Sequence, residues 1–122
     1  DTWLERSARL LSGLGLAVEA VISADAFFGR IGKLLSANQR AAALKHEIVA
    51  STRPGYGPTA LASCNYHLDH FGHFFGITLA DGSPAHSACV GFGPDRIAVA
   101  LLAAHGTDPT AWPAQLHDQL SP

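Results

Sequence analysis

The sequence contains no methionine, only two cysteines and few charged residues. Of its 122 residues 15% are charged, and eight Lys and Arg against ten Asp and Glu give a formal net charge of −2. Because the cations are scattered along the chain, the sequence predicts no basic surface for nonspecific binding of nucleic acid. Two cysteines, Cys64 and Cys89, are too few for a disulfide-rich secreted scaffold, so we interpret them as core residues or metal ligands in a reducing compartment.

Long apolar runs are also missing. No stretch approaches the roughly 18 uninterrupted apolar residues of a membrane span, and the first residues lack the basic-then-apolar plan of a signal peptide. We therefore expect a cytoplasmic protein with no membrane partner. With 48% hydrophobic residues, a chain of this length can build one core but not two, so residues 1–122 are expected to form a single domain or part of one. The absence of methionine predicts that they belong to a longer or processed chain.

Apolar spacing and turn residues predict the order of the secondary structure. Helices are expected over residues 3–14, 31–40, 94–105 and 111–120, and strands over 16–22, 43–50, 59–67, 77–79 and 85–90. The segment 43–50 fits helix and strand almost equally, and its β-branched end favours strand. The last two strands are expected to pair as a hairpin around a turn at 80–84. This order predicts an α+β fold, an antiparallel sheet flanked by helices.

A histidine-rich turn over residues 68–76, together with His67 just before it, carries one candidate site. His67, His70 and His73 with Asp69 are residue types that bind zinc and similar ions. Two glycines argue against a regular helix there, and the spacing matches no recognised metal motif. The competing interpretation is a set of ordinary hydrogen-bonded polar residues. A histidine-rich metallohydrolase is therefore the weakest functional hypothesis.

Residues 86–96 predict a strand, a glycine turn and a helix that Pro94 opens. Cys89 falls at the end of a predicted central strand, where a thiolate can face a cleft, although a single cysteine also fits a small buried core position. Arg96 lies in the first helical turn, where a cation opposes the helix dipole, so its presence predicts a bound anion. The glycine turn at 91–93 is similar to an anion cradle, but Ser87 does not lie in a nucleophile elbow.

Residues 88–96 (ACVGFGPDR) resemble motif 3 of the class II aminoacyl-tRNA synthetases. Further blocks at residues 25–30 (DAFFGR), 63–67 (SCNYH), 69–72 (DHFG) and 105–113 resemble the amino acid:[carrier protein] ligases. These ligases are homologues of the catalytic domain of atypical, zinc-dependent seryl-tRNA synthetases. The resemblance implies that the chain is a single partial domain, the C-terminal part of that catalytic domain, with motif 3 at about 85–105. Motif 2 and two zinc ligands are expected upstream, so the segment alone is expected to be inactive.

The resemblance implies activation of a small amino acid, glycine or alanine, by ATP and transfer to the phosphopantetheine of a carrier protein, with no tRNA substrate. It implies Zn²⁺, Mg²⁺ with ATP, and a homodimeric full-length protein. Cys89 falls on a zinc ligand, Arg96 on the catalytic motif 3 arginine that contacts ATP with Gly93, and Asn65 and Ser63 on the substrate-binding strand. The alternative is a degenerate synthetase-like module that binds or regulates without activity.

The same resemblance implies a docking surface for an acidic carrier protein over residues 25–40. Its cations are Arg30, Lys33 and Arg40. Two departures from the family pattern stand out: Pro94 with Asp95 replaces the usual leucine and glutamate, and Cys64 replaces an apolar residue and is interpreted as a spare thiol.

Overall fold

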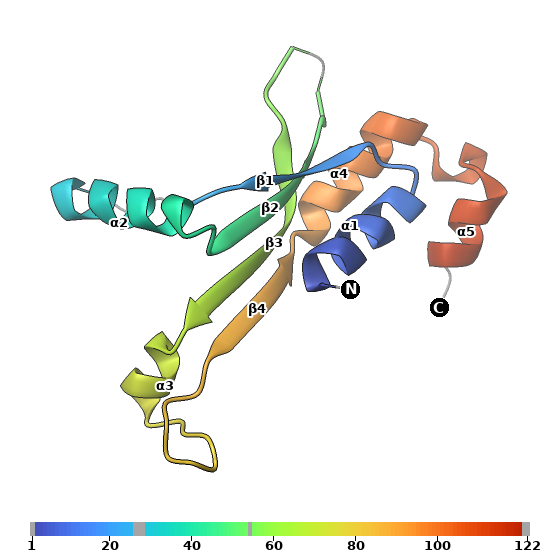
Figure 1. The fold of residues 1–122 in the computed structure, drawn as a ribbon. Coiled ribbons are helices and arrows are strands. Elements are labelled where there is room, and N and C mark those ends of the chain that lie inside the picture. Colours follow the sequence, from blue (N-terminus) through green and yellow to red (C-terminus); the bar gives the residue numbers. More distant parts are fainter. Residues whose placement is uncertain (1, 26–28, 54, 121–122) are drawn as a thin grey trace. The chain divides into compact units, whose positions relative to one another are not determined.

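The structure is a computed structural model that describes the backbone of residues 2–25, 29–53 and 55–120, with the side chains of 29–32 and 35 left out (Figure 1). Its elements are α1 Trp3–Gly13, β1 Val18–Ile22, α2 Gly29–Ala41, β2 Lys45–Ala50, β3 Thr59–Leu68, α3 His70–Phe75, β4 Ser87–Phe92, α4 Pro94–His105, the 3₁₀ helix η1 Pro109–Ala111 and α5 Ala114–Leu120. Within these described residues, no helix has both the length and the apolar character that crossing a membrane requires.

The four strands form one antiparallel sheet in the order β1-β2-β3-β4. Backbone bonds join the end of one strand to the beginning of its neighbour, which is the antiparallel pattern. They are Ser23 N–H to Lys45 O (2.9 Å), Tyr66 N–H to Leu44 O (2.8 Å) and Gly93 N–H to Leu61 O (2.8 Å). The predicted α+β class is confirmed. The expectation that Cys89 lies on a central strand is wrong for this sheet, because β4 is its edge strand.

The chain divides into two compact units. The first comprises Asp1–Val21, Glu47–Ser63 and Phe92–Pro122, and the second comprises Ile22–His46 and Cys64–Gly91. The first unit contains the apolar core, in which Leu11, Ile48 and Leu61 are fully buried. Apolar side chains of α1, β2, β3, α4 and α5 meet in this core, and their helical or alternating spacing explains why these segments fold as they do.

Both ends of the first unit are held by specific polar contacts. A capping box begins α1: Thr2 Oγ1 accepts from Glu5 N–H (3.3 Å), and Glu5 Oε2 accepts from Thr2 N–H (2.7 Å). At the other end, His105 Nε2 lies 2.9 Å from Leu14 O, and Trp112 Nε1–H donates to Gly106 O (2.9 Å). In these contacts the block at 105–113 has a structural role.

In the second unit, the expectation of an irregular turn at 68–76 is wrong, because α3 is a short helix. Gly72 is buried and packs so closely on Ala85 that a Cβ atom would lie 2.3 Å from the Ala85 carbonyl oxygen. Gly76 ends the helix in the left-handed conformation (φ 65°). Each glycine thus serves close packing or termination, so neither interrupts the helix.

The predicted hairpin between residues 77–79 and 85–90 is only partly present. Leu79 N–H donates to Ser83 O (2.8 Å) and Ala85 N–H to Ile77 O (2.9 Å), but Thr78 and Pro84 form an isolated bridge. The regular strand lies at Ser87–Phe92 and pairs with β3, which offers ten residues for pairing. The strand β4 therefore pairs along its length with β3 and not with residues 77–79.

Candidate functional site

A cluster of four polar side chains lies on one face of β3 and β4 in the second unit. Asn65 and His67 are two residues apart on β3, and Ser87 and Cys89 are two residues apart on β4, so each pair points to one side of its strand. Asn65 Nδ2 donates to Cys89 Sγ (3.4 Å), and His67 Nδ1 lies 3.0 Å from Ser87 Oγ. His67 Nε2 lies 3.6 Å from Cys89 Sγ. Antiparallel pairing thus gathers an amide, an imidazole, a hydroxyl and a thiol, here called the thiol cluster.

Cys89 is exposed, so the interpretation of this residue as a small buried hydrophobe is wrong. An exposed cysteine sulfur is of the ligand type that zinc binds, so Cys89 has the right chemistry for one ligand of a zinc ion. Three or four protein ligands are needed for a tight site. Among the residues that the structure describes, no group of three or more His, Cys, Asp and Glu side chains is arranged to hold a metal ion. Cys89 therefore fits as one ligand of a set that these residues do not complete.

The histidines of residues 67–73 do not converge on one point. His73 Nε2 lies 3.2 Å from Asp69 Oδ2, one helical turn away, and both side chains are exposed. His70 instead contacts Phe71, with ring centroids 5.1 Å apart. His67 faces the thiol cluster. The hypothesis that these three imidazoles and Asp69 form a metal centre of a metallohydrolase has no geometric support in the described residues.

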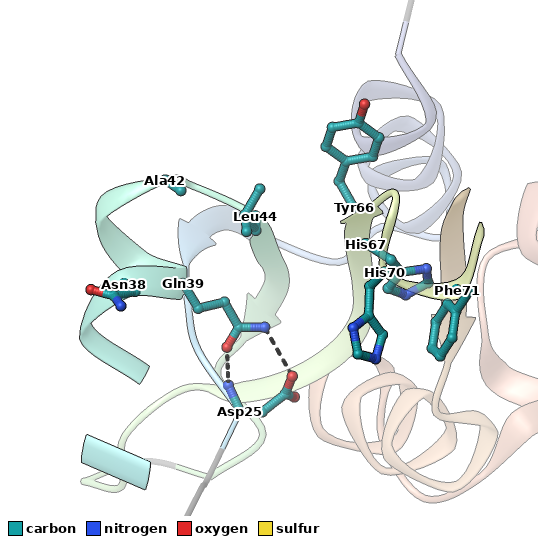
Figure 2. Close-up of a pocket in the computed structure, with 9 residues that line it drawn as sticks. All are labelled: Asp25, Asn38, Gln39, Ala42, Leu44, Tyr66, His67, His70 and Phe71. Carbon is teal, nitrogen blue, oxygen red and sulfur yellow. Dashed lines mark hydrogen bonds between the residues drawn. The ribbon is translucent and has the colours of Figure 1, made fainter. Parts of the chain in front are cut away.

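A pocket of about 530 Å³ lies next to the thiol cluster in the second unit (Figure 2). Figure 2 shows imidazole and aromatic rings of β3 and α3 on one side and polar side chains near the end of α2 on the other. Its lining residues are Asp25, Asn38, Gln39, Ala42, Leu44, Tyr66, His67, His70 and Phe71. Because His67 both lines the pocket and contacts Cys89, it connects the pocket to the thiol.

Asp25 holds one wall of this pocket in place. Its N–H donates to Gln39 Oε1 (2.7 Å), and Gln39 Nε2 donates to its Oδ2 (2.9 Å), as Figure 2 shows. Ser36 Oγ donates to the Asp25 carbonyl (3.0 Å), and Lys45 Nζ forms an ion pair with Oδ1. The Gln39 hydrogen bond, followed by that of Lys45, lowers the pKa of the Asp25 carboxyl. Asp25 thus ties α2 to the strands on either side of it in the chain.

Arg96 and Gly93 lie in the first unit, at the beginning of α4. Arg96 is exposed, and its Nη1 donates to Ala60 O on β3 (3.1 Å). This contact is a structural reason for a cation in the first turn of a helix, where Asp95 also complements the dipole. A guanidinium has five N–H donors, so this bond leaves others for an anion. The roles of Arg96 and Gly93 toward ATP stay predictions.

The remaining predicted residues lie on β3 and α2. Ser63 is half-buried on β3, two residues before Asn65, and their substrate roles stay predictions. Lys33 and Arg40 are exposed on α2, and their spacing of seven residues places them on one side of the helix. The side chain of the predicted docking residue Arg30, like Phe27 and Phe28 of the same block, lies outside the described residues.

The sequence alone did not identify His67 as the neighbour of Cys89, or Asp25 as an anchor. The available signal was alternation, since Asn65 and His67 on one strand and Ser87 and Cys89 on another are each spaced by two. Using that signal requires the pairing register of β3 and β4, and the 18 residues between these strands do not reveal it.

Comparison with solved structures defines the class of fold. The chain superposes on the crystal structure of A. aeolicus tRNASec in complex with M. kandleri SerRS with a TM-score of 0.73 and 23% identity, over 96% of this chain and 24% of that one. The fold is therefore that of a segment of a seryl-tRNA synthetase-like, class II domain.

Curated relatives narrow this class. The chain is 43% identical to amino acid–[acyl-carrier-protein] ligase 1 and 42% identical to ligase 2 of Bradyrhizobium diazoefficiens, each over 120 residues. It is 33% identical over 61 residues to the type-2 serine–tRNA ligase of Methanopyrus kandleri, covering 50% of this chain and 12% of that protein. No protein-family model matches. The resemblance to the amino acid:[carrier protein] ligases is thus confirmed, and the chain spans just over a third of their length (37% and 36%).

Proposed function

We propose that the full-length protein is an ATP-dependent ligase. It activates a small amino acid, glycine or alanine, as an aminoacyl adenylate and transfers it to the phosphopantetheine thiol of a carrier protein. The observation that carries this proposal is the alignment of the chain, over 98% of its length, with two amino acid–[acyl-carrier-protein] ligases at 43% and 42% identity. Because the chain spans only part of those relatives, the activity is assigned to the whole protein.

In this proposal, Arg96 contacts ATP from the first turn of α4. A guanidinium there offsets the negative charge that develops on the α-phosphate as the carboxylate attacks, together with Mg²⁺. The bond from Arg96 Nη1 to Ala60 O supports the role, because it orients the guanidinium while other N–H groups stay available. Gly93 is proposed to contact ATP beside Arg96. A Cβ atom at this position would lie 3.4 Å from Arg96 Cδ, an ordinary van der Waals contact, so the Arg96 side chain does not itself require a glycine there.

Cys89 supplies one thiolate ligand of a zinc ion, and the other ligands come from outside the described residues. When bound, the zinc supplies a Lewis acid that selects a free amino group. The exposure of Cys89 on the edge strand β4 supports this role, because a ligand that must be shared with other segments has to be accessible. Asn65 and Ser63 of β3 are each proposed to orient the amino acid.

The carrier protein docks on α2 through Lys33 and Arg40. Their exposure and shared side of the helix support an electrostatic encounter with an acidic partner, which raises the association rate more than the affinity. The full-length protein is proposed to be a homodimer and not to use tRNA as acceptor.

Amino-acid-dependent ATP–pyrophosphate exchange of the full-length protein tests the first step, with glycine and alanine as substrates. Arg96→Ala is expected to reduce exchange about 10²–10³-fold, as removal of a transition-state donor does. Cys89→Ala is expected to weaken it sharply. Arg53→Ala and Cys64→Ala are matched controls and should retain exchange. Full exchange in both the Arg96 and Cys89 variants contradicts the assignment.

Transfer of the activated amino acid tests the second step. A phosphopantetheinylated carrier protein should be loaded and tRNA should not. The double variant Lys33→Glu, Arg40→Glu should slow loading without changing exchange. The double variant Arg9→Glu, Arg53→Glu, outside α2, is the charge-matched control. Carrier binding without any exchange by the wild type supports the competing function, a synthetase-like binding or regulatory module.

A further inference from the structure

We propose that His67 is a positioning residue for Cys89: its Nε2–H donates to Sγ and holds the thiolate in the direction from which it binds a metal ion. The inference rests on the zinc role of Cys89 under Proposed function, and it assigns to His67 a role that the sequence did not indicate. The two atoms are 3.6 Å apart across β3 and β4, within the range of hydrogen bonds to sulfur.

The proposal places the imidazole proton of His67 on Nε2, directed at Cys89. Ser87 Oγ lies 3.0 Å from Nδ1, and because a serine hydroxyl both donates and accepts, it can donate to Nδ1 in this tautomer. A metal-bound cysteine is a thiolate and accepts only, so this tautomer is the one that fits the metal-bound state.

The orientation of the ring is also held. Phe71 packs edge-on against His67, with ring centroids 4.8 Å apart and an interplanar angle of 74°. Ser87 and Phe71 thus constrain the imidazole from two elements, β4 and α3. Asn65 Nδ2 gives Cys89 Sγ a second N–H donor at 3.4 Å. In the proposal, Asn65 and His67 of β3 both donate to Cys89 Sγ, and these two bonds orient the sulfur so that a remaining lone pair faces the metal ion.

Outer groups of this kind orient metal ligands and tune the metal, and their loss costs about 10–100-fold in metal affinity. The full-length protein is tested by zinc titration against a competing chelator and by the charge-transfer absorption of its Co²⁺-substituted form. His67→Leu is expected to weaken zinc binding about 10–100-fold. It should also shift the thiolate-to-cobalt band to lower energy, because a thiolate without its N–H donor is a stronger electron donor. A merely structural defect does not produce that shift.

Two variants serve as controls for His67→Leu. His67→Gln retains an N–H group near the position of Nε2 and should restore most of the affinity and the band position. His70→Leu removes another imidazole of the same pocket that does not contact Cys89, and it should leave both measurements unchanged. Circular dichroism confirms that each variant is folded, and if His67→Leu does not fold, His67→Ala, which also lacks the N–H donor, takes its place with the same expected loss of affinity and band shift.

The outcomes separate the two proposals. Wild-type zinc affinity in Cys89→Ala overturns the zinc role of Cys89 itself. Loss of zinc in Cys89→Ala, with wild-type affinity and an unshifted band in His67→Leu, overturns only the positioning role. Complete loss of zinc in both His67→Leu and His67→Gln identifies His67 as a direct ligand and likewise overturns it.

Discussion

Replacement of Gly72 by alanine sets helix propensity against packing, and the structure predicts that packing prevails. Gly72 is buried in α3, and a Cβ atom there would lie 2.3 Å from Ala85 O and 2.7 Å from Ala85 N. The first distance is about 1 Å short of ordinary van der Waals contact. The atoms that would have to move belong to the backbone, and Ala85 N–H donates to Ile77 O (2.9 Å). The clash therefore also disturbs a hydrogen bond.

Alanine in place of glycine would stabilise an exposed helix by about 1 kcal/mol. Overpacking costs about 1–3 kcal/mol, and more where backbone must shift. Because the clash here is with backbone atoms, the upper part of that range applies, about 2–3 kcal/mol. After subtraction of the helix gain, we expect Gly72→Ala to lower the free energy of unfolding by about 1–2 kcal/mol. Urea denaturation measures the change, and hydrogen exchange at the Ala85 amide locates it. Gly57→Ala is the control, since no atom lies within 4 Å of its added Cβ. A Gly72→Ala protein as stable as wild type, with unchanged exchange at Ala85, would refute this reasoning.

Two further predictions concern an ion-pair anchor and the core. Because the Gln39 hydrogen bond and then Lys45 lower the pKa of Asp25 below its usual 3.8, its stabilisation is complete above about pH 3.8 and is lost as the pH falls through the lowered pKa. The free energy of unfolding, measured as the pH is lowered, should fall less in Asp25→Asn than in wild type. An equal fall in both proteins would contradict the stabilising role of the Asp25 carboxylate. Ile48 is completely buried, so Ile48→Ala should cost about 2–5 kcal/mol in thermal or urea unfolding; a cost below 1 kcal/mol would show that the site is not packed as described.

The sequence predicted most elements of this fold because their signals are local. Apolar spacing in α1 and α4, the proline that opens α4 and the apolar run of β3 depend on neighbouring residues, and each element is confirmed. The prediction from sequence is wrong at Gly72, since this glycine argues against a regular helix but lies inside α3. Its actual role, close approach to Ala85, depends on a residue 13 positions away and leaves no local signal.

In the candidate site, too, some features follow from local sequence and others from contacts between distant residues. The sequence by itself determined the chemistry-bearing residues, since Cys89 and Asn65 carry the resemblance to the ligases, and the comparisons confirmed that resemblance. Only the tertiary structure decided which groups surround the thiol. A one-residue change in the register of β3 and β4 would have turned Asn65 and His67 to the opposite face from Cys89. Side-chain alternation is encoded locally, but register is set by contacts between strands.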